Sequence, residues 1–462
     1  MDFLTLAKER KEELIQELKQ IIQIESVLDE KSATPDAPFG KGPKQALHWL
    51  LSKASEEGFL VKNVDNYAGH IEMGDGEGLL GILCHVDVVP AGGNWTFPPF
   101  EGIIKDGKLY GRGAIDDKGP TMAAFLAMKI VKDAKIPLQK RVRLIVGTDE
   151  ETGFRCVEHY FEKEEMPDIG FAPDADFPLI NAEKGIALLQ FSQIGDMSNS
   201  EQLQSFEAGE RHNMVPDLAK AVVKNVASDF EAQFQQFFSN YEEEVSLTKD
   251  GEEYIIAVTG KSAHAMEPEK GINAAVELAK FLKSQLQAGA SKEFVSFVAD
   301  VFGNVYGEPL SLQYEDEMSG PTTLNAGVVS YDPEHGGRIL VSMRYSVTYP
   351  FEEKITQAQR LTKYPFALDV VSNSKPHYIP EDDEFIQSLL KVYRHYTGDD
   401  SKPLSTGGGT YARTLKKGVA FGSLFPGESD VAHQADEYVV IDNLVKAAAI
   451  YAEAIVELAG KN

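Results

Sequence analysis

Residue types that bind divalent metal ions recur along this sequence where apolar segments end. His85 and Asp87 stand two positions apart in the apolar run GILCHVDVVP, residues 81–90, so on a β-strand both side chains face the same side. A lone histidine and aspartate at this spacing are more often a hydrogen-bonded core pair than metal ligands. Further carboxylates and an imidazole in other predicted loops favour a metal site instead. These residues are Asp116, Asp117, Glu150, Glu151, Asp174 and His433.

Such a set of side chains fits a pair of metal ions. Two divalent ions about 3.5–4 Å apart need a bridging carboxylate, and each needs a further carboxylate and imidazole. The pair polarises a carbonyl group and lowers the pKa of a water between the ions. Glu150 and Glu151 are neighbours, and adjacent side chains of an extended segment diverge, so one is free to bind metal while the other acts as general base. The alternative is that residues 149–151 form a solvated acidic turn.

The segments that would position these residues predict an α/β fold. Strands are expected at residues 59–64, 69–73, 81–90 and 141–148, helices at 44–57 and 122–133, and one amphipathic helix near the amino terminus through residue 22. In α/β sheets, ligands gather in loops at the carboxyl ends of strands. From about residue 185 the pattern changes to strands at 185–194, 253–258 and 337–347 and a helix at 273–285. We therefore expect a catalytic domain of residues 1–185 and 376–462 and an inserted α+β domain of residues 186–375.

Composition restricts the class of partner and the compartment. The formal charge of −27, from 72 acidic and 45 basic residues, opposes binding to nucleic acid or an anionic membrane surface. No apolar run approaches the ~18 residues of a membrane span, and the first residues lack the pattern of a secretion signal. Cys84 and Cys156 are the two cysteines, which gives no disulfide framework. A cytoplasmic protein is expected.

Seven motifs together carry a resemblance to a known family. They are CHVDVVPAG, YGRGAIDDKGP, GTDEETG, FAPDADFP, GKSAHAMEP, STGGGTYAR and AHQADE. This set resembles the zinc-dependent aminoacylase and carboxypeptidase-G family of metallopeptidases, and within it the monomeric dipeptidase V type. The resemblance implies a catalytic domain with a mixed sheet flanked by helices, and an inserted lid domain that is duplicated. One departure is Asp176 in FAPDADFP, where the dipeptidase pattern usually has glutamate.

The resemblance implies two metal ions with a shared ligand. His85, Asp116 and Asp174 match the ligands of one ion, and Asp116, Glu151 and His433 match those of the other, which makes Asp116 the bridge. The implied cofactor is two divalent ions per chain, Zn²⁺ foremost, with Mn²⁺ or Co²⁺ as alternatives.

Three further features of the metal site follow from the resemblance. Asp87 matches the carboxylate that orients His85 and raises its basicity. Glu150 matches the general base. The family also has a cis peptide between the bridging residue and the next, here Asp116 and Asp117.

Substrate contacts are implied from the inserted domain and a glycine-rich segment. His264 matches the residue that hydrogen-bonds the scissile carbonyl oxygen, and Asn213 matches a substrate-binding position. Arg344 suits bidentate capture of a terminal carboxylate, with the backbone of Gly408 and Gly409 helping before a predicted helix. Without the resemblance these would be a surface histidine, a salt bridge at a strand end and a tight turn. GGGTYAR lacks the GK[ST] of a P-loop, which argues against nucleotide binding.

The expected function is hydrolysis of dipeptides with a free amino terminus by a water activated between two metal ions. One alternative is deacylation of N-acyl or N-succinyl amino acids at the same metal centre. A second, less favoured, is a metal-binding scaffold without catalysis. Dimeric relatives have a lid about half as long and borrow a histidine from the partner, so the long insertion here predicts a monomer that acts on small dipeptides.

Overall fold

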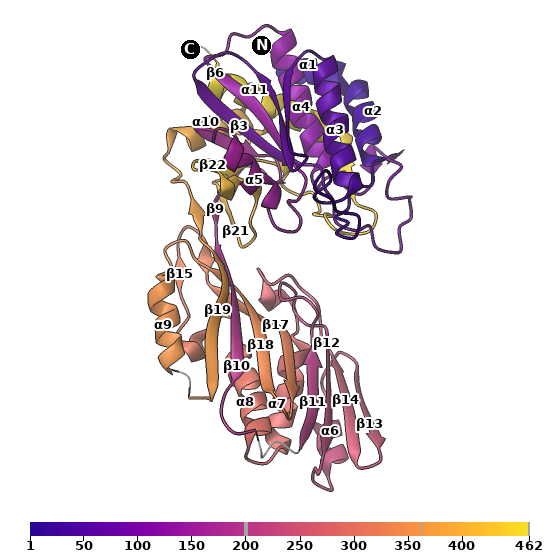
Figure 1. Ribbon diagram of the computed structural model, residues 1–462, viewed down its shortest axis with the longest axis vertical. Coiled ribbons are helices and arrows are strands. Elements are labelled where there is room, and N and C mark those ends of the chain that lie inside the picture. The colour runs from indigo at the N-terminus through magenta and orange to yellow at the C-terminus, as the bar shows by residue number, and fades with distance from the viewer. Residues whose placement is uncertain (198–201, 362, 461–462) are drawn as a thin grey trace. The chain divides into compact units, whose positions relative to one another are not determined.

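The computed structural model describes residues 1–197, 202–361 and 363–460. The chain forms two compact units (Figure 1). The first contains residues 1–181, 378–404 and 409–462, and the second contains residues 182–377 and 405–408. The domain boundaries expected at residues 185 and 376 stay predictions, because a domain is a unit that folds by itself, whereas the two units described here are defined by their compactness.

The first unit is built on a mixed sheet with strand order β1-β2-β6-β3-β7-β22. These strands are β1 (Leu60–Val64), β2 (Ala68–Met73), β3 (Gly78–His85), β6 (Lys140–Gly147), β7 (Ile169–Ala172) and β22 (Gly418–Ala420). Strands β6, β3, β7 and β22 run parallel, whereas β1 and β2 are antiparallel to their neighbours. The same sheet also contains β9 (Ile180–Glu183), β20 (His377–Tyr378) and β21 (Leu404–Thr406).

Helices and short strands complete the first unit. The helices are α1 (Phe3–Glu9), α2 (Lys11–Ile22), α3 (Lys41–Glu56), α4 (Lys118–Asp133), α5 (Arg155–Lys163), α10 (Glu384–Thr397), the 3₁₀ helix η3 (Tyr411–Thr414) and α11 (Ile441–Ala459). The short strands are β4 (Ile103–Lys105), β5 (Lys108–Tyr110), β8 (Ala175–Asp176), β23 (Ser423–Leu424) and β24 (Tyr438–Val440). Among the described residues, no helix combines the length and apolarity that crossing a bilayer requires.

Strand β3 is apolar up to its last residue, His85, because both faces of the sheet are covered. Ile82 and Cys84 enter a large core with side chains of α4 and α11, while Leu83 enters a smaller core with α5 and Tyr411. A strand buried on both faces has a nearly fixed register, since a slip of one residue would exchange the two sets of side chains. The last residue of β3, His85, is therefore held in one position.

The second unit is an eight-stranded antiparallel sheet with order β13-β14-β12-β11-β17-β18-β10-β19. Its strands are β10 (Gly185–Gln193), β11 (Leu203–Ala208), β12 (Leu218–Lys224), β13 (Val245–Asp250), β14 (Glu253–Thr259), β17 (Thr323–Asp332), β18 (Gly336–Tyr345) and β19 (Phe366–Ser374). The remaining elements are α6 (Phe230–Phe237), η1 (Pro268–Lys270), α7 (Ala274–Gln285), α8 (Ala290–Phe302), η2 (Glu308–Leu310), β15 (Glu315–Asp316), β16 (Gly320–Pro321) and α9 (Phe351–Leu361).

One face of this sheet forms a separate core. Burial alternates residue by residue along β10, and its inward side chains pack with aromatic residues of α6, α7 and α8. The predicted fold class, a mixed α/β unit with an inserted α+β unit, is confirmed. Duplication within the insertion stays a prediction.

Two local predictions were wrong. The first helix is broken at Arg10, whose backbone leaves the helical region with φ −104° and ψ 12° and whose guanidinium bonds to Glu13 and Asp133. The strand expected through residue 90 ends at His85, so Asp87 lies beyond the regular ladder.

Candidate functional site

The predicted metal ligands follow the carboxyl ends of three parallel strands. His85 ends β3, Glu150 and Glu151 follow β6, and Asp174 follows β7. Because β6, β3 and β7 are adjacent and parallel, their ends meet at one edge of the sheet. Asp116 comes from the loop before α4. His433 comes from the loop before β24.

His85 lies at the centre of this group and its side chain is fully buried. Its Nε2 atom is 3.0 Å from Asp116 Oδ1 and 3.7 Å from Asp174 Oδ2. On the other side of the ring, Nδ1 lies 3.0 Å from the backbone oxygen of Asp87 and 3.4 Å from its Oδ1. Asp87 therefore faces Nδ1, the imidazole nitrogen that points away from Asp116 and Asp174. A partner at this nitrogen fixes the tautomer of a histidine that binds metal through Nε2.

His433 approaches the same aspartate from the opposite side. Its Nε2 atom is 2.9 Å from Asp116 Oδ2 and 3.0 Å from Glu151 Oε2. The two oxygens of Asp116 thus face two different imidazoles. A carboxylate placed in this way has the geometry to bridge two cations.

This cluster contains two groups of three residues whose possible ligand atoms all lie within 4.8 Å of one another within the group. They are His85, Glu150 and Asp174, and His85, Asp116 and Glu151. The structure places Glu150 beside His85 and Asp174. At this distance its carboxylate could bind the same ion as they do, or hydrogen-bond to a water next to that ion. Its role as base, and the division of the ligands between two ions, stay predictions.

The charges in this cluster call for cations. Burial, together with the carboxylates of Asp174 and Glu151, raises the pKa of Glu150 well above its usual range despite the opposing effect of His85. Burial and the neighbouring Asp116 raise the pKa of Glu151 to about 7. Acidic groups with raised pKa values are favourable sites for a positive charge.

Without metal ions, the imidazoles of His85 and His433 supply the positive charge that this acidic cluster favours. Hydrogen bonds with Asp116 and Glu151 raise the pKa of His433 to about 11. Burial opposes protonation of His85, but contacts with Asp116 and Asp174 outweigh it and raise its pKa well above the usual value. The Nε2 atom of His85 is buried, and it makes no hydrogen bond with any of the residues that the structure describes. An imidazole nitrogen and several carboxylate oxygens around one point are a donor set that suits Zn²⁺ or Mn²⁺.

Glu150 and Glu151 lie in a turn after β6, which corrects the expectation of an extended segment. The turn is closed by a hydrogen bond from the Phe154 backbone N–H to the Asp149 backbone oxygen, 2.9 Å. Arg155 donates to both oxygens of the buried Asp149 carboxylate at 2.7 and 2.8 Å. Asp87 Oδ2 accepts from the backbone N–H of Glu151 at 3.1 Å. The turn is thus fixed at both ends.

Asp149 was not singled out from sequence, although it belongs to the same acidic run as the two glutamates. Its carboxylate faces Arg155, six positions later, and supports the turn. The signal in the sequence was an aspartate directly before the two glutamates with an arginine six positions after it.

The peptide between Asp116 and Asp117 is cis, as expected. Asp117 itself is buried and accepts from the His85 backbone N–H at 3.0 Å and from the Thr121 hydroxyl at 3.2 Å. Its carboxylate therefore supports the backbone of His85.

The predicted substrate-binding residues of the second unit come together in one region. The loop of Asn213 pairs with the loop of His264 through a hydrogen bond from Ala265 N–H to Asn213 O, 2.9 Å, and an isolated bridge between Met214 and His264. Arg344 is the last residue but one of β18, and its Nη1 donates to the Gly407 oxygen at 2.9 Å.

The glycine-rich segment lies beside these residues. A Cβ added at Gly407 would stand 2.8 Å from Met266 Cβ, two residues after His264. Gly408 N–H donates to Thr406 Oγ1 at 3.0 Å. Beyond Gly409, the predicted helix is the four-residue η3, too short for the dipole of a longer helix to matter. Roles for Gly408 and Gly409 in binding a carboxylate stay predictions.

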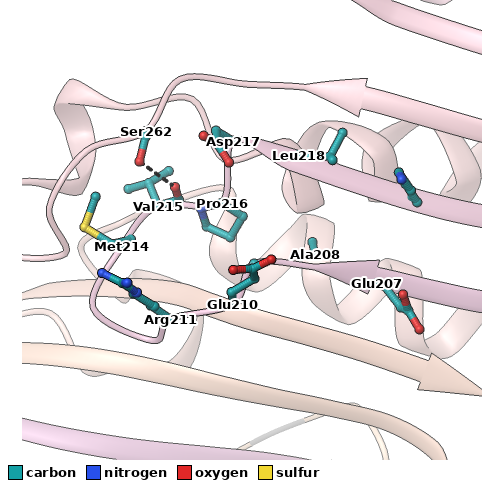
Figure 2. A pocket seen from close by; sticks show the side chains of 12 residues that line it. Glu207, Ala208, Glu210, Arg211, Met214, Val215, Pro216, Asp217, Leu218 and Ser262 are labelled. Carbon is teal, nitrogen blue, oxygen red and sulfur yellow. Dashed lines mark hydrogen bonds between the residues drawn. The ribbon is translucent and has the colours of Figure 1, made fainter. Parts of the chain in front are cut away.

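A pocket of about 460 Å³ adjoins the Asn213 loop (Figure 2). Its lining includes both basic and acidic residues, among them Arg211, Glu210 and Asp217, and Met214. The Ser262 hydroxyl and the Val215 oxygen, 3.5 Å apart, join its two loops (Figure 2). Arg211 and Met214, which lie before and after Asn213 in its loop, both line this pocket.

Solved structures with low sequence identity share the fold. Human carnosine dipeptidase 1 aligns with a TM-score of 0.56 at 16% identity, over 98% of both chains. The di-peptidase Dug1p from Saccharomyces cerevisiae aligns with a TM-score of 0.56 at 14% identity, over 99% of this chain and 98% of that one.

Sequence relatives are much closer. "Putative dipeptidase YtjP" of Bacillus subtilis (strain 168) is 47% identical over 455 residues, which cover 97% of this chain and 98% of the relative. A "Putative dipeptidase" of Staphylococcus epidermidis (strain ATCC 12228 / FDA PCI 1200) is 41% identical over 458 residues, with 97% and 98% covered. Residues 81–457, which include every predicted metal ligand, match the model of peptidase family M20/M25/M40. The chain therefore belongs to peptidase family M20/M25/M40.

Proposed function

We propose that this peptidase hydrolyses dipeptides with a free amino terminus and depends on two divalent metal ions. The observation that carries the proposal is the cluster in which Asp116 faces both His85 and His433 while three further carboxylates surround it. Relatives named as dipeptidases at 47% and 41% identity support the substrate class.

In this proposal each member of the cluster has a separate task. His85, Asp116 and Asp174 hold one ion, and Asp116, Glu151 and His433 hold the other. Two bound ions supply Lewis acidity, which polarises a carbonyl and makes water more acidic. Zn²⁺ is the first choice of metal, with Mn²⁺ or Co²⁺ as alternatives.

Glu150 is proposed as the general base and then the acid. A carboxylate beside the ions suits this task, because it takes the proton of the attacking water and returns it to the leaving amine. His264 is proposed to bind the carbonyl oxygen as it gains negative charge.

The ends of the dipeptide are proposed to be recognised separately. Arg344, with the backbone at Gly408 and Gly409, would bind the terminal carboxylate, and Asn213 would contact the peptide. The proximity of Arg344 to Gly407 supports this assignment. A carboxylate near the metal ions would pair with the free amino group, and this pairing would separate a dipeptidase from an N-acyl or N-succinyl amino acid deacylase.

The test compares matched substrates on the metal-loaded chain. A free dipeptide should be hydrolysed at least tenfold faster, in kcat/KM, than the same dipeptide with an acetylated amino group, because the capped amine loses its charge. Equal or faster hydrolysis of the capped form would favour the deacylase.

The Glu150→Ala variant should lose at least about 10²-fold in kcat while retaining metal, and unchanged turnover would remove the proposed base. Absence of hydrolysis of any free dipeptide by the metal-loaded chain would favour a scaffold.

Three further parts of the proposal rest on the sequence alone. They are membership of the dipeptidase V type, a monomeric state and a cytoplasmic location. Light scattering of the purified chain at two concentrations tests the second, since a monomer keeps its mass on dilution.

A further inference from the structure

A buried ion pair, Arg112 and Glu437, lies next to the loops that carry the candidate metal ligands. The exposed fraction of the side chain is 1% for Arg112 and 0% for Glu437. Glu437 is four positions after His433, and Arg112 is four positions before Asp116. Arg112 Nη1 donates directly to Glu437 Oε2.

The second oxygen of Glu437 holds the backbone at Asp116. Its Oε1 atom accepts from the N–H of Ile115 at 3.0 Å and from that of Asp116 at 3.4 Å. The backbone oxygen of Glu437 accepts from Gly111 N–H at 2.9 Å. One residue thus joins the His433 loop to both ends of the Asp116 loop.

Arg112 extends the connection to a third loop. Its Nη2 atom lies 3.4 Å from the backbone oxygens of Pro90 and Ala91, just after Asp87. The guanidinium also lies over the Trp95 ring, 5.3 Å from its centre. The ion pair therefore contacts all three segments that carry His85, Asp116 and His433.

The His433 loop needs such support because its backbone is unusual. His433 and Asp436 have φ values of 63° and 58°, in the left-handed region that residues other than glycine seldom adopt. Asp436 Oδ1 accepts from the N–H of Thr96 at 2.7 Å. The loop is therefore tied by Asp436 on one side and by Glu437 on the other.

We propose that Glu437, paired with Arg112, is a positioning residue that fixes Asp116 relative to His433 and so sets the affinity of the metal site. The inference rests on the proposed metal centre, not on the identity of the substrate. A buried ion pair contributes little net stability, since desolvation of both charges offsets their attraction. Its value here is geometric, because the carboxylate binds the backbone of one ligand and belongs to the loop of another.

The experiment measures Zn²⁺ affinity of the full-length chain after removal of metal, by competition with a chromophoric chelator. Glu437→Gln keeps the size of the side chain but removes its charge. We expect the weaker of the two Zn²⁺ sites to lose about 10–100-fold in affinity, the range for residues that support metal ligands from behind. Arg112→Lys keeps the positive charge and loses the fork that reaches Pro90 and Ala91, so it should weaken Zn²⁺ by a smaller factor, above twofold.

Glu72→Gln is the matched control. Glu72 pairs with Arg143 at 2.6 Å in the same unit, and Arg143 lies four residues before the end of β6. This variant should lose stability in urea without metal, as we also expect of Glu437→Gln because one partner of a buried ion pair is removed in each, but it should keep Zn²⁺ affinity within twofold. A purely structural role for Glu437 predicts that the two variants behave alike.

Zn²⁺ affinity within twofold of the wild type in Glu437→Gln overturns the inference and leaves the proposed dipeptidase in place. If that variant does not fold, the same result in Arg112→Lys overturns it. A wild-type chain that binds Zn²⁺ but cleaves no dipeptide removes the proposed function, while a loss of affinity in Glu437→Gln still supports the inference. A wild-type chain that binds none of Zn²⁺, Mn²⁺ and Co²⁺ overturns both.

Discussion

At the scale of single residues, the cluster depends on groups that hold the ligands as much as on the ligands. Asp87 illustrates this, because one oxygen accepts from Glu151 N–H while the other lies near His85 Nδ1. Asp87 thus contacts two predicted ligands, the imidazole ring of His85 and the backbone of Glu151.

We expect Asp87→Asn to lower kcat/KM by about 10–100-fold while most of the bound metal is retained. The amide keeps the shape and one acceptor oxygen but loses the charge that favours the His85 Nδ1–H tautomer. Asp116→Asn should instead lose metal from both sites, because that side chain faces both imidazoles. Metal content by mass spectrometry, measured beside kinetics, separates the two. Equal metal loss in both variants would contradict a supporting role for Asp87.

His70 gives a prediction on pH that does not involve the metal. It is 6% exposed, lies 2.8 Å from the Tyr160 hydroxyl, and burial, with Arg143 and Lys62 nearby, lowers its pKa to about 3. Because the unfolded chain binds a proton near pH 6.5 and the folded chain does not, stability falls as pH decreases from about 6.5 towards 3. At pH 5 this one group costs about 2 kcal/mol relative to neutral pH.

Urea unfolding of the wild type and of His70→Gln at pH 7.5 and pH 5, both with chelator, measures this effect. The glutamine variant should lose less stability on acidification, by about 2 kcal/mol, since it cannot be protonated. The same pH dependence in both chains would show that His70 is protonated in the folded state.

At the scale of elements, the parallel strands bring the ligands to one edge by packing closely. Gly170 on β7 lies between Gly81 on β3 and the strand β22. A Cβ there would be 2.6 Å from the Gly81 oxygen and 2.7 Å from Leu415 Cδ1. Glycine is required at this position because backbone, which cannot move aside, fills the space.

Gly170→Ala should lower the free energy of unfolding by about 1–3 kcal/mol through overpacking. Gly93→Ala is the control, since a Cβ at that position meets nothing within 4 Å and should change stability by less than about 0.5 kcal/mol. Denaturant unfolding with and without bound Zn²⁺ measures both. A neutral Gly170→Ala would mean that the strands separate more easily than their contacts indicate.

At the scale of the whole molecule, bound metal should couple activity to stability. Ions that bind the folded chain alone stabilise it by about 2.7 kcal/mol when present at 100 times their Kd. Treatment with a chelator should therefore lower Tm and abolish hydrolysis, and added Zn²⁺ or Mn²⁺ should restore both.

The measurement is differential scanning fluorimetry beside a dipeptide assay, with buffer of equal ionic strength as control. Ionic strength needs matching because the chain carries a net charge of −27, and salt alone changes repulsion among its carboxylates. A Tm that does not respond to chelator would contradict the metal centre.

Much of this molecule follows from local sequence. Apolar runs with turn residues at their ends predict β1, β2, β3, β6 and α4, and the change of pattern near residue 185 predicts a unit of different architecture. Residue chemistry alone favours a metal site, because acids and imidazoles recur after strands. The break at Arg10 escaped prediction; there the guanidinium pairs both with Glu13 and with Asp133, which is far along the chain.

Tertiary structure decided the rest, because the site exists through contacts between distant residues. The 2.9 Å approach of His433 to Asp116, and the way Glu437 and Arg112 hold their loops, depend on which strands are neighbours in the sheet. The turn of Glu150 and Glu151 likewise depends on Asp87, a residue of another loop. Sequence determines which groups the chain can offer to a metal ion; only the packed sheet determines which of their atoms meet, since hydrogen bonds and coordination need positions fixed to within fractions of an ångström.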